Sequence, residues 1–200
     1  MMKKLILFAL LMLCASGRTW GADVTIGQNS TVRNTVIASG DNLVISATGI
    51  TLDNATIAGT CAISQAVTAR NVTFYGDVTL DNGITLTATY CDFLQSEAAV
   101  ETAGGTVGTK TGCKFSTDPK LVNPTGSRDI DYMIKPDSPC RGAGTNLSAT
   151  FTTGLSPRGG GLTDERGEIW DIGAFVYVPS RWELLWDRMF GRGRWSRMTN

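Results

Sequence analysis

The chain has 200 residues, with 18 basic and 18 acidic side chains and no histidine. The lack of histidine excludes Ser-His-Asp and Cys-His catalysis, histidine-ligated zinc and the usual histidine pH switch. Only 18% of the residues are charged and 42% are hydrophobic. We therefore expect one domain with a packed core rather than a disordered chain.

Residues 1–22 have the pattern of a secretory signal peptide. Two lysines precede an apolar run from Leu5 to Leu13, which is too short to span a bilayer. Small residues follow, and we expect cleavage after Ala22. Lipid attachment at Cys14 would need a small residue before it, and a leucine stands there. The segment predicts an exported protein, either secreted or retained in the cell envelope.

Charge is distributed unevenly along the chain. Removal of the signal peptide takes three basic residues and no acidic one, leaving 15 basic and 18 acidic residues. Residues 180–200 hold five arginines and two acids, so residues 23–179 contain 10 basic and 16 acidic residues. An acidic body is a poor match for a phosphate backbone, and we predict no nucleic-acid partner.

Residues 23–116 contain a repeat without helical periodicity. Five segments align, and their last residues, all aromatic or aliphatic, are 17 to 22 positions apart: Val32–Ile37, Leu52–Ile57, Ala69–Phe74, Ala88–Phe93 and Lys110–Phe115. Short strand-like pieces lie between them, joined by Gly, Asn and Asp. Coils of about 20 residues with this pattern are typical of a parallel β-helix. We predict an all-β fold of five or six coils.

The alignment also predicts where side chains point. The first and last residues of the segments should point inward: Val32, Leu52 and Ala69, and Ile37, Ile57, Phe74, Phe93 and Phe115. Three asparagines should stack at one corner, because Asn tolerates a left-handed backbone and stacked amides bond along a column. These are Asn34, Asn54 and Asn71. The acidic residues Asp77, Asp81 and Asp92 are expected at turns and on the surface.

Four cysteines remain after signal cleavage, an even number that permits two disulfides in an exported chain. Cys91 and Cys113 should lie on neighbouring coils, about 4.8 Å apart along the stack. That spacing is within disulfide range, but side chains on adjacent parallel strands often diverge. A Cys91–Cys113 bond and two packed thiols both remain open. Cys61 and Cys140 would form the remaining pair.

Three motifs follow the repeat in order, and a fourth lies further on: Asp118-Pro119-Lys-Leu-Val-Asn-Pro124, Asp131-Tyr-Met-Ile134, Asp137-Ser-Pro-Cys-Arg-Gly-Ala-Gly144 and Asp171-Ile-Gly-Ala-Phe175. This series resembles the closing segment of bacterial, often surface-associated, exported right-handed β-helix proteins of the pectin-lyase-like superfamily. The resemblance implies a right-handed helix whose closing segment, residues 117–179, completes the last coils. Its prolines favour an irregular cap across the open end of the solenoid.

The resemblance implies two catalytic schemes, since this fold hosts lyases, hydrolases, epimerases and non-catalytic modules. The polygalacturonase scheme needs a histidine and is excluded. The lyase scheme needs Ca²⁺ held by carboxylates and an Arg or Lys base, for which the candidates are Arg33, Asp53 and Arg70. The alternative is an exposed ladder of ion pairs, each worth less than about 1 kcal/mol. We favour the ladder, because Ca²⁺ needs several clustered carboxylates.

The leading functional hypothesis is an exported, non-catalytic β-helix module that binds carbohydrate, as a polysaccharide or a cell-surface glycan, or another cell-surface component. A short stack of coils without long loops disfavours catalysis, and Tyr75 is the candidate residue for stacking on a sugar ring. One alternative is a small Ca²⁺-dependent lyase of the pectate type, and another is a structural or assembly protein. No cofactor and no metal site are expected outside the lyase alternative.

Residues 180–200 are predicted to form an amphipathic helix rich in Trp and Arg. Ser180 and Glu183 have the spacing of a capping box, and four large apolar residues share one face: Trp182, Leu185, Trp186 and Met189. We expect this helix to cover the end of the β-helix. Contact with an anionic membrane surface or with another subunit is the alternative.

Overall fold

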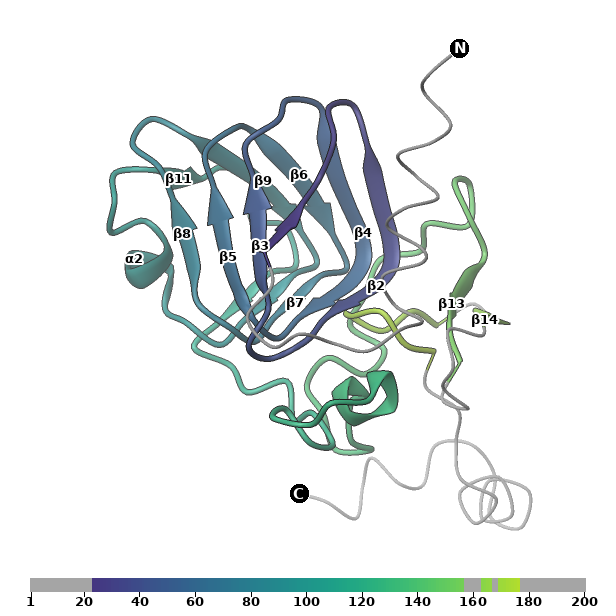
Figure 1. Ribbon diagram of the computed structural model, residues 1–200. Helices are drawn as coiled ribbons and strands as arrows, with labels where there is room; N and C mark the ends of the chain where they lie inside the picture. Colours follow the sequence, from purple (N-terminus) through teal and green to yellow (C-terminus); the bar gives the residue numbers. More distant parts are fainter. Residues whose placement is uncertain (1–22, 157–162, 167–168, 177–200) are drawn as a thin grey trace, which may run out of the picture.

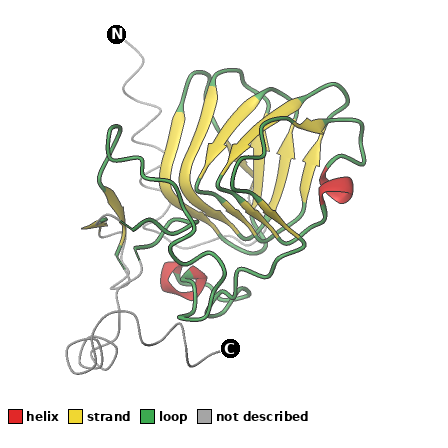
Figure 2. Cartoon of the chain, turned by 180° about the vertical axis from the view of Figure 1, so that it is seen from behind, coloured by secondary structure: helices red, strands yellow, loops and turns green. Residues whose placement is uncertain are grey.

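The computed structural model describes residues 23–156, 163–166 and 169–176 (Figure 1). The predicted signal peptide, residues 1–22, and the predicted helical tail, residues 180–200, lie outside the described residues. The described chain forms a parallel β-solenoid of about 5 turns with little helix (Figures 1 and 2). The all-β, parallel β-helix fold predicted from the repeat is therefore confirmed.

Each coil contributes short parallel strands to two sheets. The first sheet consists of β1 (Asp23–Thr25), β3 (Asn42–Ile45), β5 (Thr60–Ile63) and β8 (Val78–Leu80). The second sheet is bent along its length and forms the other two sides of the coil. Before the bend lie β6 (Val67–Arg70), β9 (Thr85–Thr89) and β11 (Thr106–Val107). After it lie β7 (Thr73–Phe74), β10 (Asp92–Phe93) and β12 (Lys114–Phe115), while β2 (Thr31–Ile37) and β4 (Ile50–Ile57) run through it.

The bend lies at one left-handed residue per coil. Asn34, Asn54 and Asn71 have φ angles of 49°, 48° and 53°, and the same corner continues through Tyr90 and Gly112. The amides bond along the column: Asn54 Nδ2 donates to Asn34 Oδ1 at 3.4 Å, and Asn71 Nδ2 donates to Asn54 Oδ1 at 3.1 Å. The predicted asparagine column is confirmed.

The solenoid interior is built from columns of side chains that run from coil to coil. The longest column is in register on every coil and consists of Ile37, Ile57, Phe74, Phe93 and Phe115. Its three phenylalanine rings stack with 4.8 Å between successive centroids. A second predicted column is also buried and in register: Val32, Leu52 and Ala69. The inward directions expected from the repeat are confirmed.

A short helix, α2 (Glu97–Val100), lies beside β8 at the far end of the first sheet (Figure 1). The Ser96 side chain caps it by accepting a hydrogen bond from the Ala99 backbone N–H at 3.2 Å. Val100 is buried in the solenoid core. The helix therefore covers the last edge of the first sheet, where a further strand would otherwise pair. No helix in the described parts of the chain has the length and apolar character needed to span a membrane.

The described part of the closing segment lies along the flank formed by the strands after the bend (Figure 1). It includes a short 3₁₀ turn, η1 (Asp129–Tyr132), and β13 (Thr153–Leu155), which is antiparallel to β14 (Thr163–Glu165). The Ala174 N–H donates to Thr56 Oγ1 at 3.1 Å, and Thr73 Oγ1 donates to the Ile172 carbonyl at 3.3 Å. A second hydrophobic cluster fills the space between flank and segment.

This arrangement corrects the prediction that the closing segment crosses the open end of the solenoid. The flank can be covered because its outward side chains are small or carry hydroxyl groups. Ala38, Ala58, Thr56 and Thr73 are all buried there. Apolar residues of the segment, such as Ile172, pack on this surface. Among the described residues, the one charged side chain that they leave beneath them is that of Asp92.

All four described cysteines are free thiols, so neither predicted disulfide is present. Cys91 and Cys113 do lie on adjacent coils, and the Cys91 N–H approaches Cys113 Sγ at 3.5 Å. Cys61 belongs to the solenoid interior, whereas Cys140 belongs to the cluster on the flank. The second sheet therefore separates Cys61 from Cys140. Burial raises the pKa of Cys61 to about 12, which keeps this thiol protonated.

Candidate functional site

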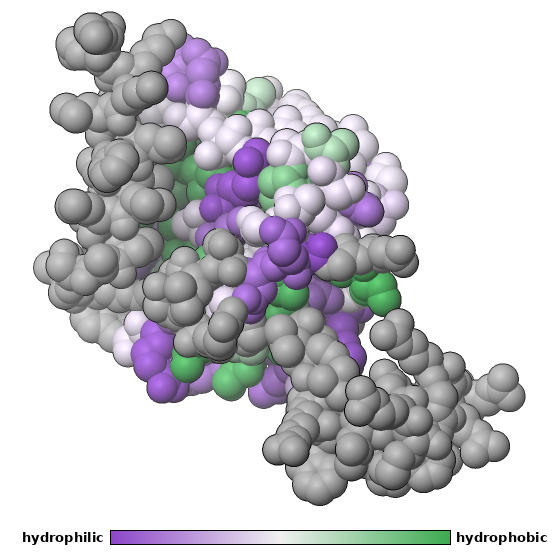
Figure 3. All heavy atoms as spheres, turned by 90° about the vertical axis from the view of Figure 1, so that its right-hand side faces the viewer, coloured by the Kyte–Doolittle hydropathy of each residue, from purple (hydrophilic) through white to green (hydrophobic). Residues whose placement is uncertain are grey.

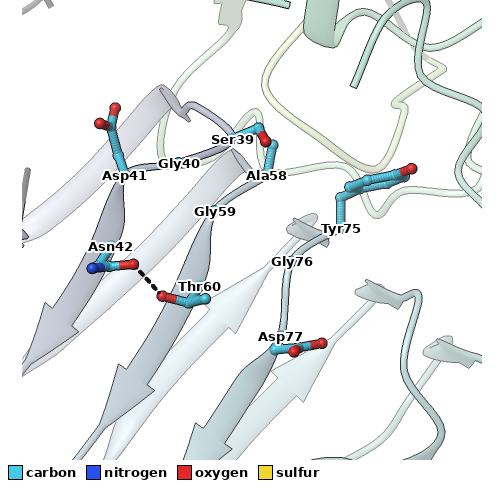
Figure 4. A pocket seen from close by; sticks show the side chains of 10 residues that line it. All are labelled: Ser39, Gly40, Asp41, Asn42, Ala58, Gly59, Thr60, Tyr75, Gly76 and Asp77. Carbon is cyan, nitrogen blue, oxygen red and sulfur yellow. Dashed lines mark hydrogen bonds between the residues drawn. The ribbon is translucent and has the colours of Figure 1, made fainter. Parts of the chain in front are cut away.

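A groove of about 300 Å³ lies where three successive coils turn into the first sheet (Figure 4). Each coil contributes one short stretch to its lining: residues 39–42, 58–60 and 75–77. Because the three stretches belong to stacked coils, the groove runs across neighbouring turns. We call it the Tyr75 groove, after the tyrosine that the sequence singled out as a sugar-stacking candidate.

Glycines form the floor of the Tyr75 groove. A Cβ atom on Gly59 would overlap the carbonyl oxygen of Asp41, and one on Gly76 would overlap the carbonyl oxygen of Gly59. Only glycine therefore allows these turns to stack so closely. Sequence reasoning missed both residues, although a signal was present. In two coils a glycine stands two positions after the last inward residue: Gly59 after Ile57, and Gly76 after Phe74.

Polar and aromatic groups line the groove. Tyr75 is half-buried and packs partly against the flank cluster. Figure 4 shows its ring and the Asp41 and Asp77 carboxylates at separate edges of the groove. Asn42 Nδ2 donates to Asp23 Oδ1 at 3.0 Å, and Thr60 Oγ1 donates to Asn42 Oδ1 at 2.5 Å. No basic side chain belongs to the lining. The groove thus offers mainly acceptors and one ring.

The structure brings the three lyase candidates together, in register on neighbouring coils. Arg70 binds Asp53 with two hydrogen bonds, from Nε to Oδ1 at 2.7 Å and from Nη2 to Oδ2 at 2.8 Å. Arg33 Nη2 lies 3.7 Å from Asp53 Oδ2, and its guanidinium stacks 4.2 Å from the Phe151 ring centroid. The predicted ladder is present, but it is not fully exposed, because Asp53 is completely buried.

The pairing with Arg70 occupies both oxygens of the one carboxylate among the three lyase candidates. Both Asp53 oxygens accept hydrogen bonds from Arg70, so a metal ion would have to displace a guanidinium. Within residues 23–156, 163–166 and 169–176 no three acidic or cysteine side chains are grouped as metal ligands. Two arginines thus share the one buried carboxylate of Asp53.

Replacing Asp53 with asparagine is expected to lower the free energy of unfolding by about 1–2 kcal/mol, because two charge-assisted hydrogen bonds are weakened. The loss stays moderate because both arginines are about one third exposed and remain partly hydrated. Urea unfolding at neutral pH measures the change. Asp81→Asn, at an exposed turn, is the matched control and should change stability by less than about 0.5 kcal/mol. Equal midpoints for the two variants would contradict a stabilising role of Asp53.

Asp92 departs most from expectation. The sequence suggested a surface position, but the residue, which lies in β10, is completely buried beneath the closing segment. Neither carboxylate oxygen has a hydrogen-bond partner among the described residues. Burial raises the pKa of Asp92 to about 7, against the smaller opposing effects of the Cys140 thiol and Lys114. No pattern in the sequence signals this burial, because it depends on where the closing segment docks.

Surface apolar residues offer no competing site. Among the described residues, only three large apolar side chains are exposed: Leu94, Val122 and Ile169. The face in Figure 3 shows apolar residues only in small separate areas between polar ones. The Tyr75 groove is therefore the candidate site with the most varied chemistry. Comparisons of the chain with protein-family models, with curated proteins and with solved structures found no match.

Proposed function

We propose that this protein is an exported, non-catalytic β-helix module that binds carbohydrate through the Tyr75 groove. The observation that carries the proposal is that a half-buried aromatic ring and several acceptor groups line one concave site. The C–H face of a sugar packs on a tyrosine ring, and its hydroxyl groups donate to carboxylate and amide oxygens. The closing motifs, which resemble those of surface-associated β-helix proteins, support export and placement at the cell surface.

The rigidity of the site favours an extended glycan. Stacked turns hold polar groups about 4.8 Å apart along the solenoid axis. The bond from Thr60 to Asn42 fixes two of these groups on successive coils, and the bond from Asn42 to Asp23, which lies outside the lining, anchors Asn42 to the coil before. A preorganised surface of this kind loses little conformational entropy when a chain binds along it.

The negative charge of the groove lining narrows the class of glycan that the groove can bind. Asp41 and Asp77 line the groove without a cation among the lining residues, so a uronic-acid polymer would meet like charges. Neutral sugars, or sugars carrying an amino group, match the acceptor-rich lining. The same reasoning weakens the lyase alternative, whose substrate is acidic and whose candidate arginines both pair with Asp53.

Tyr75→Ala is expected to weaken glycan binding about tenfold or more, because it removes the ring on which the sugar packs. Tyr75→Phe keeps the ring and should bind nearly as well as the wild type. Asp77→Asn should also weaken binding, whereas Asp81→Asn, on an exposed turn outside the groove, should not. A glycan array identifies the ligand, and calorimetry with that ligand compares the variants.

The alternatives predict different results. With polygalacturonate and Ca²⁺, a lyase would release unsaturated products and raise ultraviolet absorbance, and we expect no increase. A rise in absorbance that Arg70→Lys abolishes would replace the module with the lyase alternative. If the wild-type protein binds no glycan on the array, the carbohydrate proposal fails and a structural or assembly role takes its place.

A further inference from the structure

Asp92 occupies a position that is neutral on the preceding coils. It is in register with Thr73 on the coil before and Lys114 on the coil after, and Thr73 is in register with Thr56. Both threonines use their hydroxyl groups to bind the closing segment. Asp92 makes no such bond, and the closing segment covers a carboxylate whose support from that side is the thiol of Cys140, a weak hydrogen-bond donor.

The groups around Asp92 give its charged form little support. From the solenoid, Lys114 attracts the carboxylate across one coil spacing without forming an ion pair. From the closing segment, the Cys140 thiol faces it and favours the charged form, whereas Asp118 repels it. Burial has the largest effect and favours the neutral acid. The docked closing segment therefore selects the protonated form of Asp92.

We propose that Asp92 is a pH-dependent latch: when it is protonated the closing segment docks on the flank, and when it ionises the segment is released so that water reaches the carboxylate. The latch acts on the part of the segment that carries Asp118 and Cys140. The pairing of β10 with β7 and with β12 is made by backbone groups, so these strands are expected to stay in place when the segment opens.

The direction of the pH effect follows from proton linkage. The pKa of Asp92 is about 7 in the docked state and returns towards its ordinary value of 3.8 once water reaches it. Between these two values the open state releases a proton that the docked state keeps. The contribution of Asp92 to docking is therefore greatest below about pH 4, weakens as the pH rises towards 7, and changes little above that.

Release of the closing segment would also affect the Tyr75 groove. The Ser39 N–H, at one edge of the groove, donates to the Tyr132 hydroxyl of the closing segment at 2.9 Å. Tyr75 itself packs against the cluster that the segment completes. Glycan affinity is therefore expected to fall over the same pH range. This last expectation rests on the proposed function, whereas the latch does not.

Hydrogen exchange of the mature protein, followed by mass spectrometry from pH 4.5 to 8.5, tests the latch. Rates are corrected for the intrinsic pH dependence of exchange. Protection of amides that bond within the segment, such as Val122 N–H to the Met133 carbonyl and Lys135 N–H to the Lys120 carbonyl, should fall about tenfold or more between pH 5 and 7. Amides of β5 in the interior should keep constant protection and serve as the internal reference.

Variants separate the latch from general pH effects. Asp92→Asn removes the charge and should make protection of the segment independent of pH. Asp92→Thr places at this position the residue that the two preceding coils carry, and it should behave in the same way even if the asparagine variant folds poorly. Asp81→Asn should keep the wild-type profile. Wild-type protection that does not change with pH, or an unchanged slope in Asp92→Thr, would overturn the proposal. Retained protection with pH-dependent glycan binding would overturn it as well.

Discussion

Phe93→Ala is expected to lower the free energy of unfolding by about 3–5 kcal/mol. The ring is completely buried and stacks on Phe74 and on Phe115, with 4.8 Å between centroids on each side. Truncation would leave a cavity in the middle of the column that neither neighbour can fill, since each ring is held at the spacing of its own coil. Chemical unfolding followed by circular dichroism measures the loss.

Phe115→Ala is the matched control for Phe93→Ala. Its ring ends the same column but is only half-buried, with one stacked neighbour instead of two. The cost should be clearly smaller, about half of that for Phe93. Equal losses for the two variants would mean that burial in the middle of the column adds nothing, and would contradict the continuous interior described above.

Gly76→Ala is expected to lower stability by about 3 kcal/mol, at the upper end of what overpacking costs. The added Cβ would overlap the carbonyl group of Gly59. Because the obstacle is backbone, it cannot turn aside as a flexible side chain would. The two coils must move apart, which also deforms the floor of the Tyr75 groove. Thermal unfolding and glycan affinity should therefore both change.

Gly83→Ala separates close contact from backbone conformation. A Cβ at Gly83 would meet nothing within 4 Å, but the residue has a φ of 75°. Its substitution should cost about 1–2 kcal/mol from the left-handed backbone alone. Glycan affinity should stay at the wild-type level. If Gly83→Ala lowers stability as much as Gly76→Ala does, close stacking of the turns is not what requires glycine at position 76.

The repeat predicted the interior because a stacked coil carries its register to the next. Once Ile57 and Phe74 are aligned, the pairing of the residues before them on the same strands, Thr56 with Thr73, follows. Asn54 and Asn71 could be assigned to the corner in the same way, since their left-handed conformation is a local preference. These features depend on neighbouring residues and on one repeating distance.

Outward residues could not be predicted in this way, because their environment depends on a distant segment. Asp53 and Asp92 alternate out of the sheet as expected, yet both are buried, the first beneath arginines and the second beneath the closing segment. The prolines of that segment indicate that it forms no regular strands, but they do not indicate which surface it covers. The Tyr75 groove was likewise only half foreseen, since Tyr75 was named and the glycines beside it were not.

A cover fastened along the flank has a consequence for the length of the solenoid. The closing segment is attached at several levels of the stack, from Ser39 through Asn71, which binds Thr145, to Cys140 beside Asp92. Inserting one coil would move these attachment points apart by about 4.8 Å, whereas a lid on the end would simply move outward with the new coil. The length of the closing segment is therefore matched to the number of coils, and a longer solenoid of this design requires a longer closing segment.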